Sequence, residues 1–286
     1  MISKVIIPAA GLGKRLLSIT KEIPKEMLPL ITTNENKSIS VKPLVQIIFE
    51  QFYEMGFREF CFIVGKGKRA IEDHFSPDYR YLDQLNTKDK IESLTELEKF
   101  YNRIEDSTLV WINQPVPKGF GHAVLQARSF TNNESFLVHA GDTLIKTEKD
   151  ENISQIINTH EKEGADATLC LLQVDNTEQY GIAEITGSNS PYHVKRVIEK
   201  PKEPPTNLAI MPIYAFGKTI YETLDETKPG KGGEIQLTDG IQKLIDWKQK
   251  VLACELTNAL HLDIGTPLNY WNALKQSHRH LANNEK

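Results

Sequence analysis

Residues 5–30 decide how the rest of the chain is interpreted, and they read V-I-I-P-A-A-G-L-G-K-R-L-L-S-I-T-K-E-I-P-K-E-M-L-P-L. The apolar run 5–7 predicts a buried strand. It leads into residues 9–13, where small side chains let backbone N–H groups approach a ligand closely. Four cations follow, at Lys14, Arg15, Lys21 and Lys25. Together these features predict a polyphosphate site, in which N–H groups surround the oxygens and the cations supply countercharge.

Two common nucleotide-binding motifs do not fit this stretch. The Rossmann fingerprint needs a third glycine at position 16, which is Leu16, so an NAD-dependent dehydrogenase is disfavoured. A Walker loop needs Ser or Thr after Gly-Lys, but Gly13-Lys14 is followed by Arg15. A different kind of phosphate site must therefore explain Arg15 and the later Lys25.

Composition indicates a globular enzyme. The 286 residues are 40% apolar and 25% charged, enough for one large domain or two closely packed lobes. The net charge of −4 gives no basic field, so we expect no nucleic-acid partner. Cys61, Cys170 and Cys254 lie in predicted strands without a Cys-x-x-Cys pair, which is typical of buried thiols in a reducing compartment. With no apolar run of about 18 residues and a strand starting almost at once, we expect no signal peptide, no membrane segment and a cytoplasmic location.

The hydrophobic periodicity predicts a single α/β domain made of two halves, about 1–145 and about 146–286. Helical spacing of apolar residues predicts a helix that begins near residue 42 and ends at Gly56. The polar residues 31–40 are interpreted as a surface excursion, and the charged residues 77–106 as a solvated amphipathic helix. Strands are predicted at 5–7, 59–64, 108–113, 135–139, 167–174, 181–185, 193–199 and 209–216. We expect a Rossmann-like, mostly parallel central sheet flanked by helices, with a smaller antiparallel lobe laid on it.

The ligand crevice of an open α/β sheet lies at the carboxyl ends of its strands. The loop around Gly11, the loop that begins at Gln114 and the strand-end Asp142 should therefore meet at one edge. Asp263 also follows a short apolar run and precedes Gly265, so it is a second candidate strand-end carboxylate. Two carboxylates that approach a ligand in this way suit a hard cation such as Mg²⁺.

The motifs in residues 10–15 and 20–29 resemble the signature loop of the sugar-1-phosphate nucleotidyltransferases, most closely that of the bacterial UTP–glucose-1-phosphate uridylyltransferases. Two positions depart from that pattern: Lys14 stands where the family usually has Thr, and Ser18 where it usually has Pro. Lys14 adds positive charge, so these departures affect the shape of the loop rather than phosphate binding. The resemblance extends from residue 4 to about 275.

The resemblance implies the nucleotide-diphospho-sugar transferase fold and an activity. UTP and α-D-glucose 1-phosphate would give UDP-glucose and pyrophosphate by Mg²⁺-dependent, in-line attack on the α-phosphorus. Arg15 and Lys25 are the catalytic candidates, since a bidentate Arg and a point-charged Lys neutralise a leaving pyrophosphate. The implied nucleotide-binding residues are Ala10, Gly11, Gly13, Lys14, Glu26, Gln114 and Gly119. Gly181, Glu199 and Lys200 are the implied sugar-phosphate residues, and Asp142 and Asp263 the implied metal ligands.

Two alternatives stay open at this stage. Residues 24–29, P-K-E-M-L-P, match the uridylyltransferases rather than the thymidylyltransferases, which usually have S-K-Q-L-L-P, so Glu26 is the discriminating position. A glucose-1-phosphate thymidylyltransferase, or dual use of UTP and dTTP, remains the main alternative. A non-catalytic nucleotide-sugar sensor is the second. We also expect a homo-oligomer, a dimer or a tetramer.

Overall fold

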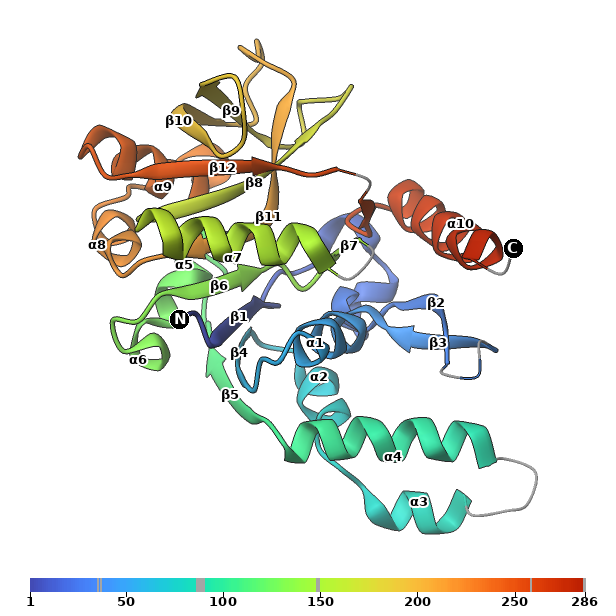
Figure 1. Cartoon of the computed structure of the whole chain (residues 1–286). Coiled ribbons are helices and arrows are strands. Elements are labelled where there is room, and N and C mark those ends of the chain that lie inside the picture. The colour runs from blue at the N-terminus through green and yellow to red at the C-terminus, as the bar shows by residue number, and fades with distance from the viewer. Residues whose placement is uncertain (35, 37, 86–90, 148–149, 258, 285–286) are drawn as a thin grey trace.

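The structure is a computed structural model that describes residues 1–34, 36, 38–85, 91–147, 150–257 and 259–284. Within these residues, nine strands form one sheet in the order β5-β4-β1-β6-β11-β8-β12-β10-β9, with two further two-stranded sheets (Figure 1). The strands are β1 Lys4–Pro8, β2 Pro29–Thr33, β3 Ile39–Pro43, β4 Glu59–Val64, β5 Thr108–Asn113, β6 Phe136–His139, β7 Thr143–Lys146, β8 Ala167–Gln173, β9 Gly181–Thr186, β10 Tyr192–Glu199, β11 Leu208–Phe216, β12 Val251–Glu255 and β13 Leu260–Asp263. The α-helices are α1 Leu44–Glu54, α2 Arg69–His74, α3 Tyr79–Leu85, α4 Ile91–Glu105, α5 Phe120–Gln126, α6 Arg128–Thr131, α7 Glu151–Glu163, α8 Thr219–Asp225, α9 Leu237–Asp246 and α10 Pro267–Asn284.

The first half of the sheet is parallel, as expected. β5, β4, β1 and β6 pair in parallel, and the predicted strands 59–64 and 108–113 have the bounds of β4 and β5. Every residue of β1 is buried, which explains the apolar run 5–7 that follows Lys4. The carboxyl ends of these strands therefore point to one edge, where the glycine loop and the residues after β5 and β6 begin.

The second half differs from the expected separate lobe. β11 pairs antiparallel with both β6 and β8, so it joins the two halves in one mixed sheet. β12 runs parallel to β8, while β9 and β10 are antiparallel at the far edge. The antiparallel strands β9 and β10 therefore continue the same sheet, and the expectation that they form a lobe laid on a parallel sheet is wrong. β11 is apolar and buried along most of its length, which suits a central strand covered on both faces.

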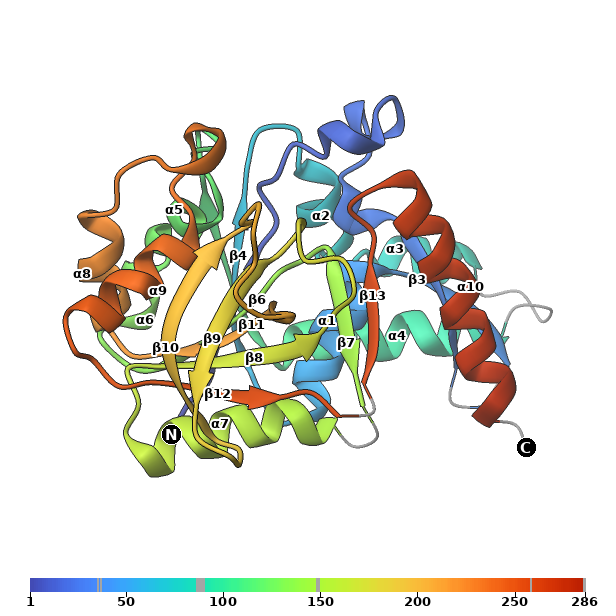
Figure 2. The same ribbon diagram turned by 90° about the horizontal axis from the view of Figure 1, so that it is seen from above.

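The structure also corrects the interpretation of residues 31–40 as a surface excursion. Residues 31–33 belong to β2 and residues 39 and 40 to β3, and the antiparallel register of these strands pairs Pro29 with Pro43 and Thr33 with Ile39. Thr and Ser side chains made this segment look like a loop, but β-branched Ile, Thr and Val favour strands when a partner strand is present. Helix α10 packs against β2 and β13 (Figure 2). Thr266 caps the first turn of α10, because Asn269 N donates to Thr266 Oγ1 at 3.1 Å.

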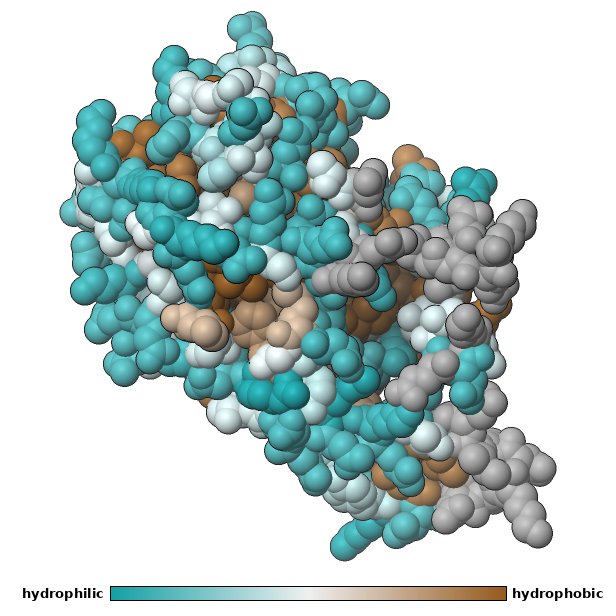
Figure 3. Space-filling view, viewed as in Figure 1, coloured by the Kyte–Doolittle hydropathy of each residue, from teal (hydrophilic) through white to brown (hydrophobic). Residues whose placement is uncertain are grey.

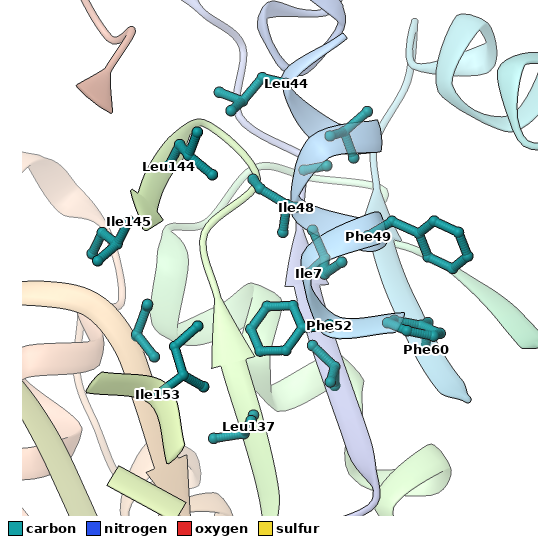
Figure 4. Packing of buried hydrophobic residues seen from close by; sticks show 14 of the residues in the cluster. Ile7, Leu44, Ile48, Phe49, Phe52, Phe60, Leu137, Leu144, Ile145 and Ile153 are labelled. Carbon is teal, nitrogen blue, oxygen red and sulfur yellow. The ribbon is translucent and has the colours of Figure 1, made fainter. Parts of the chain in front are cut away.

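Two hydrophobic clusters cover the two faces of the sheet. The alternation of strand side chains sends Phe60 and Phe62 to one cluster and Cys61 and Ile63 to the other. Residues of α1, α4 and α7 close the first face, where Phe49 and Phe52 of α1 pack beside Ile7 (Figure 4). Residues of α5, α8 and α9 close the second face. The result is a three-layer α/β/α arrangement, in which the rigid sheet positions the loops at its edge.

Within the charged segment 77–106, residues 79–85 form α3 and residues 91–105 form α4, and both helices lie beyond α1 and α2 (Figure 1). Phe100, Tyr101 and Ile104 are the buried side of α4, so the predicted amphipathic helix is confirmed in its described part. Polar residues cover most of the face in Figure 3, with smaller apolar patches between them. All three cysteines are buried and unpaired, as expected. Among the described residues, no helix is long and apolar enough to span a bilayer.

Candidate active site

A cleft of about 520 Å³ lies at the sheet edge where β1, β5 and β6 end. It is lined by residues from both halves of the chain, which the single sheet brings together. All of the predicted site residues line it: Ala10, Gly11, Gly13, Lys14, Arg15, Lys25, Glu26, Gln114, Gly119, Asp142, Gly181, Glu199, Lys200 and Asp263. The expected convergence of the glycine loop, the Gln114 loop and Asp142 is therefore found.

The glycine loop folds back on itself and places its cations at the cleft. Gly13 has a φ of 63°, and its carbonyl accepts from Leu16 N and Thr20 Oγ1, both at 2.8 Å. A Cβ at Gly13 would lie 3.0 Å from Thr20, so both the backbone angle and the space favour glycine here. Lys21 departs from the expected cation cluster. Its side chain is 77% exposed, pairs with Glu22 and is not among the lining residues of the cleft.

Lys25 and Asp142 form an ion pair in the cleft, although 117 positions separate them. Burial opposes the charged form of Lys25, but the carboxylates of Asp142 and Glu26 outweigh it and raise the pKa of Lys25. Burial likewise opposes the carboxylate of Asp142, and the charge and hydrogen bond of Lys25 outweigh it and lower its pKa. Both groups are therefore charged at neutral pH.

The pairing of β7 with β13 brings the two candidate metal aspartates together. Thr143, which follows Asp142, pairs with Asp263, and Ile264 N donates to the Asp142 carbonyl at 3.3 Å (Figure 2). Asp263 accepts hydrogen bonds from Gly265 N at 2.8 Å and from Asn269 Nδ2. The guanidinium of Arg15 lies over Gly265, where an added Cβ would be 2.7 Å from Nη2.

Glu26 is held by a partner that the sequence did not indicate. Its carboxylate is 2.7 Å from Lys68 Nζ, and the two side chains are only 1% and 7% exposed. Burial raises the pKa of Glu26, while the charges of Lys68 and Lys25 act in the opposite direction. A Cβ at Gly141 would lie 3.3 Å from Glu26 Cγ, so Glu26 packs directly under the turn that carries Asp142. Lys68, Glu26, Lys25 and Asp142 thus form a row of alternating charges beside the cleft.

Gln114 presents a fixed amide to the cleft. Its Nε2 donates to His122 Nδ1 at 2.8 Å and to the Gly119 carbonyl at 3.3 Å, which leaves its Oε1 as an acceptor. Gly119 has a φ of 109°, and a Cβ there would lie 2.6 Å from the carbonyl oxygen of Ile235. Ile235 N donates to the Lys118 carbonyl at 2.7 Å, and Gly121 N donates to the Ile235 carbonyl at 2.9 Å, so two hydrogen bonds fasten the Gln114 loop to the segment that precedes α9.

The opposite end of the cleft carries the residues predicted for a sugar phosphate. Lys200 Nζ is 2.8 Å from Glu199 Oε1, and Thr238 Oγ1 donates to Glu199 Oε2 at 2.7 Å. Lys200 has a φ of 44°, which turns the chain after β10, and its N–H donates to the Tyr180 carbonyl at 3.0 Å. Both side chains face the cleft because the strand ends there.

Several lining residues were not singled out from the sequence. Thr238, Glu234 and Gln236 belong to residues 232–239, a segment whose resemblance to the uridylyltransferases was the available signal. Tyr180 and Tyr214 give the cleft an aromatic wall that only the packing reveals. His122 is not among the lining residues of the cleft, and it instead orients Gln114 by accepting a hydrogen bond from its amide.

Comparisons with known proteins agree with this geometry. The sequence model of the nucleotidyl transferase family matches residues 4–280. The UTP–glucose-1-phosphate uridylyltransferase of Bacillus subtilis strain 168 is 39% identical over 274 residues, which cover 94% of this chain and 88% of that protein. A crystal structure of UDP-glucose pyrophosphorylase complexed with UDP-glucose has a TM-score of 0.84 at 30% identity, covering 98% and 100% of the two chains.

A second solved structure, the UTP-bound UGPase of Acinetobacter baumannii, has a TM-score of 0.82 at 29% identity and covers 96% of this chain and 93% of that chain. These likenesses extend over the whole described fold, so they include both ends of the cleft. The chain belongs to the nucleotidyl transferase family, among the UTP–glucose-1-phosphate uridylyltransferases.

Proposed function

We propose that this protein transfers a uridylyl group from UTP to α-D-glucose 1-phosphate, giving UDP-glucose and pyrophosphate. The observation that carries the proposal is the meeting of Arg15 and Lys25, Asp142 and Asp263, and Glu199 and Lys200 around one cleft. A triphosphate and a sugar phosphate repel each other, so an enzyme that joins them needs cations and positioning groups at both ends. The relatives named for this reaction support the substrates.

At the nucleotide end, the loop of Ala10, Gly11 and Gly13 offers backbone groups close to the ligand. Gln114 Oε1 is suited to accept the N3–H of uracil, since the amide nitrogen is already bound to His122 and the Gly119 carbonyl. Lys14, Arg15 and Lys25 supply the countercharge for the triphosphate. Neutralising the departing pyrophosphate is the main catalytic task in such an in-line displacement.

The residues at Asp142 and Asp263 fit a divalent cation. Mg²⁺ is bound in many sites by one or two carboxylates together with substrate phosphates and water. Among the described residues no group of three His, Cys, Asp or Glu side chains stands ready to hold a metal, which suits a site completed by the nucleotide. Bound there, Mg²⁺ would stabilise charge on the phosphate oxygens. Asp142 would then exchange the ammonium of Lys25 for the metal, which frees Lys25 for the phosphates.

At the sugar end, Lys200 is the proposed partner of the sugar phosphate. Glu199 accepts hydrogen bonds from sugar hydroxyls, and Gly181 offers backbone close to them. Thr238 orients Glu199 through its hydrogen bond, and a Cβ at Gly181 would lie 2.9 Å from Thr238 Oγ1, so glycine keeps this wall open.

We also propose that the protein is a homo-oligomer, a dimer or a tetramer, and that it is located in the cytoplasm. Light scattering tests the oligomeric state, and cell fractionation tests the location.

A coupled pyrophosphate-release assay over a matrix of nucleoside triphosphates and sugar 1-phosphates tests the proposal. We expect the largest kcat/KM with UTP and glucose 1-phosphate. A preference for dTTP would change the assignment to a thymidylyltransferase, and equal rates would indicate dual specificity. Binding of UTP without release of its pyrophosphate in the presence of any of the sugar 1-phosphates would support the non-catalytic sensor instead.

A further inference from the structure

A buried lysine, Lys68, lies behind the wall of the cleft. It follows the turn after β4 and immediately precedes α2. That turn lies against the glycine loop, because a Cβ at Gly65 would be 3.3 Å from the carbonyl oxygen of Ala10. Helix α2 also packs against the 3₁₀ turn Lys25–Met27. Lys68 is therefore carried by a segment that contacts two of the elements forming the nucleotide end of the cleft.

Lys68 contacts the cleft through Glu26. The side chain of Glu26 lines the cleft, whereas Lys68 is not among the described residues that line it, and its side chain is only 7% exposed. Lys68 Nζ donates to Glu26 Oε2 at 2.7 Å. This hydrogen bond fixes the direction in which the carboxylate faces. An effect of Lys68 on a bound nucleotide should therefore pass through Glu26.

Stability alone is a poor reason for this ion pair. The cost of removing two charges from water offsets most of their attraction, so replacing a buried pair by apolar residues of similar volume is often neutral or stabilising. Lys68 and Glu26 are both almost completely buried. What the pair does provide is a carboxylate of fixed direction and compensated charge in the wall of the cleft.

Lys68 also affects the neighbour of Glu26, the catalytic candidate Lys25. Lys25 and Glu26 are consecutive residues of the same 3₁₀ turn, and their opposite charges attract each other. The proposed function requires the Lys25 ammonium at the phosphates once a metal binds Asp142. With Lys68 present, Glu26 has a close cation of its own. Without Lys68, the uncompensated carboxylate would draw Lys25 away from the phosphates.

We propose that Lys68 is a positioning residue for the transfer reaction. It holds the Glu26 carboxylate in place in the cleft wall and keeps Glu26 from competing with the triphosphate for Lys25. This role deepens the proposed function and rests on it, since it concerns the groups that hold UTP. It assigns Lys68 to the nucleotide end of the cleft alone.

Isothermal titration of UTP with Mg²⁺ into the full chain tests this role. We expect Lys68→Met to weaken UTP binding by at least about tenfold. Lys68→Gln keeps a hydrogen-bond donor without the charge, so it should also weaken binding but be less disruptive to the fold. Circular dichroism checks that each variant is folded. Parent-like affinity in both variants would overturn the proposal.

The matched control is Lys4→Met. The side chain of Lys4 is 10% exposed and lies 2.8 Å from Glu134, so it is also a lysine in a largely buried ion pair. It lies at the opposite end of β1 from the cleft and does not belong to the described lining. Lys4→Met should leave the dissociation constant of UTP within about twofold of the parent value. Equal weakening by Lys4→Met would mean a general loss of stability and would refute the positioning role.

A double-mutant cycle shows whether Lys68 acts through Glu26. In the Glu26→Gln background, Lys68→Met should change the dissociation constant of UTP by less than about twofold, because the carboxylate that Lys68 positions is already gone. A tenfold loss that persists in that background would refute action through Glu26.

Steady-state kinetics then separate this role from the proposed function. Lys68→Met should lower kcat/KM for UTP by at least about tenfold and leave KM for glucose 1-phosphate within about twofold, because Thr238 and Glu199 position the sugar end independently. Equal rises in both KM values would show a general distortion and contradict the assignment. If the parent binds UTP but releases no pyrophosphate, the proposed function fails while the titrations still decide the role of Lys68. A parent that does not bind UTP would refute both.

Discussion

Replacing Lys68 with methionine removes the closest countercharge of a carboxylate that is almost completely buried. Glu26 is 1% exposed and lies 2.7 Å from Lys68 Nζ. Removing one partner of a buried ion pair typically costs about 3–5 kcal/mol, since the other charge stays buried without its match. Lys25 still attracts Glu26, so we expect the lower part of that range.

That cost converts to a melting temperature through the size of the chain. At about 2.1 cal/mol/K per residue, unfolding of 286 residues has an entropy near 0.6 kcal/mol/K. A loss of about 3–4 kcal/mol therefore lowers Tm by about 5–7 °C. Thermal unfolding followed by circular dichroism, at equal protein concentration, measures the shift.

Two further variants make this measurement decisive. Lys68→Met combined with Glu26→Gln replaces the ion pair by neutral groups of similar size, so most of the lost stability should return. Lys250→Met breaks a pair of similar length, 2.8 Å from Glu163, whose side chains are 36% and 48% exposed, and should change Tm much less. The reasoning is refuted if Lys68→Met melts with the parent, or if the double variant is no more stable than the single one.

Three other predictions follow from the same structure. Asp142→Asn should lower kcat by about 100-fold or more, because a carboxylate that helps to stabilise the charge of the transition state is lost. The circular dichroism spectrum should stay unchanged. A fully active variant would remove Asp142 from the mechanism. Gly119→Ala should lower the free energy of unfolding, measured in urea, by about 1–3 kcal/mol more than Gly187→Ala. Both glycines have a positive φ, but only Gly119 has a backbone oxygen 2.6 Å from the new Cβ. Equal losses of stability in the two variants would contradict this crowding. Burial lowers the pKa of His139 to about 4, so the unfolded chain binds a proton that the folded chain excludes, and stability falls as pH drops from about 6.5 to 4. His139→Gln should remove up to about 3 kcal/mol of that pH dependence, and identical curves for parent and variant would show that His139 does not cause it.

Local sequence patterns were enough to predict most strands and the residue types of the site. β4 was predicted with its observed bounds because a buried parallel strand is a continuous apolar run, and β5, a half-buried edge strand, was predicted from its own apolar run 109–112. The glycine loop was recognised because small residues follow a short apolar run and cations come soon after them, and the structure adds that Gly13 has a positive φ. The strand-end position of Asp142 also places it at the ligand edge of any sheet of this class.

Only the tertiary structure decided how distant segments meet. The position of β11 between β6 and β8 depends on competition among all strands for partners, which no local pattern records. The hairpin of β2 and β3 was missed because its polar strands gain their preference from each other and from α10.

The same reason explains the contacts within and beside the cleft. Lys68 reaches Glu26 across 42 positions and Thr238 reaches Glu199 across 39, whereas Lys21, near the glycine loop in sequence, points away to solvent. Local sequence fixes the dihedral preferences and the chemistry of each side chain, but ion pairs and cavities depend on which side chains the folded chain excludes from water together.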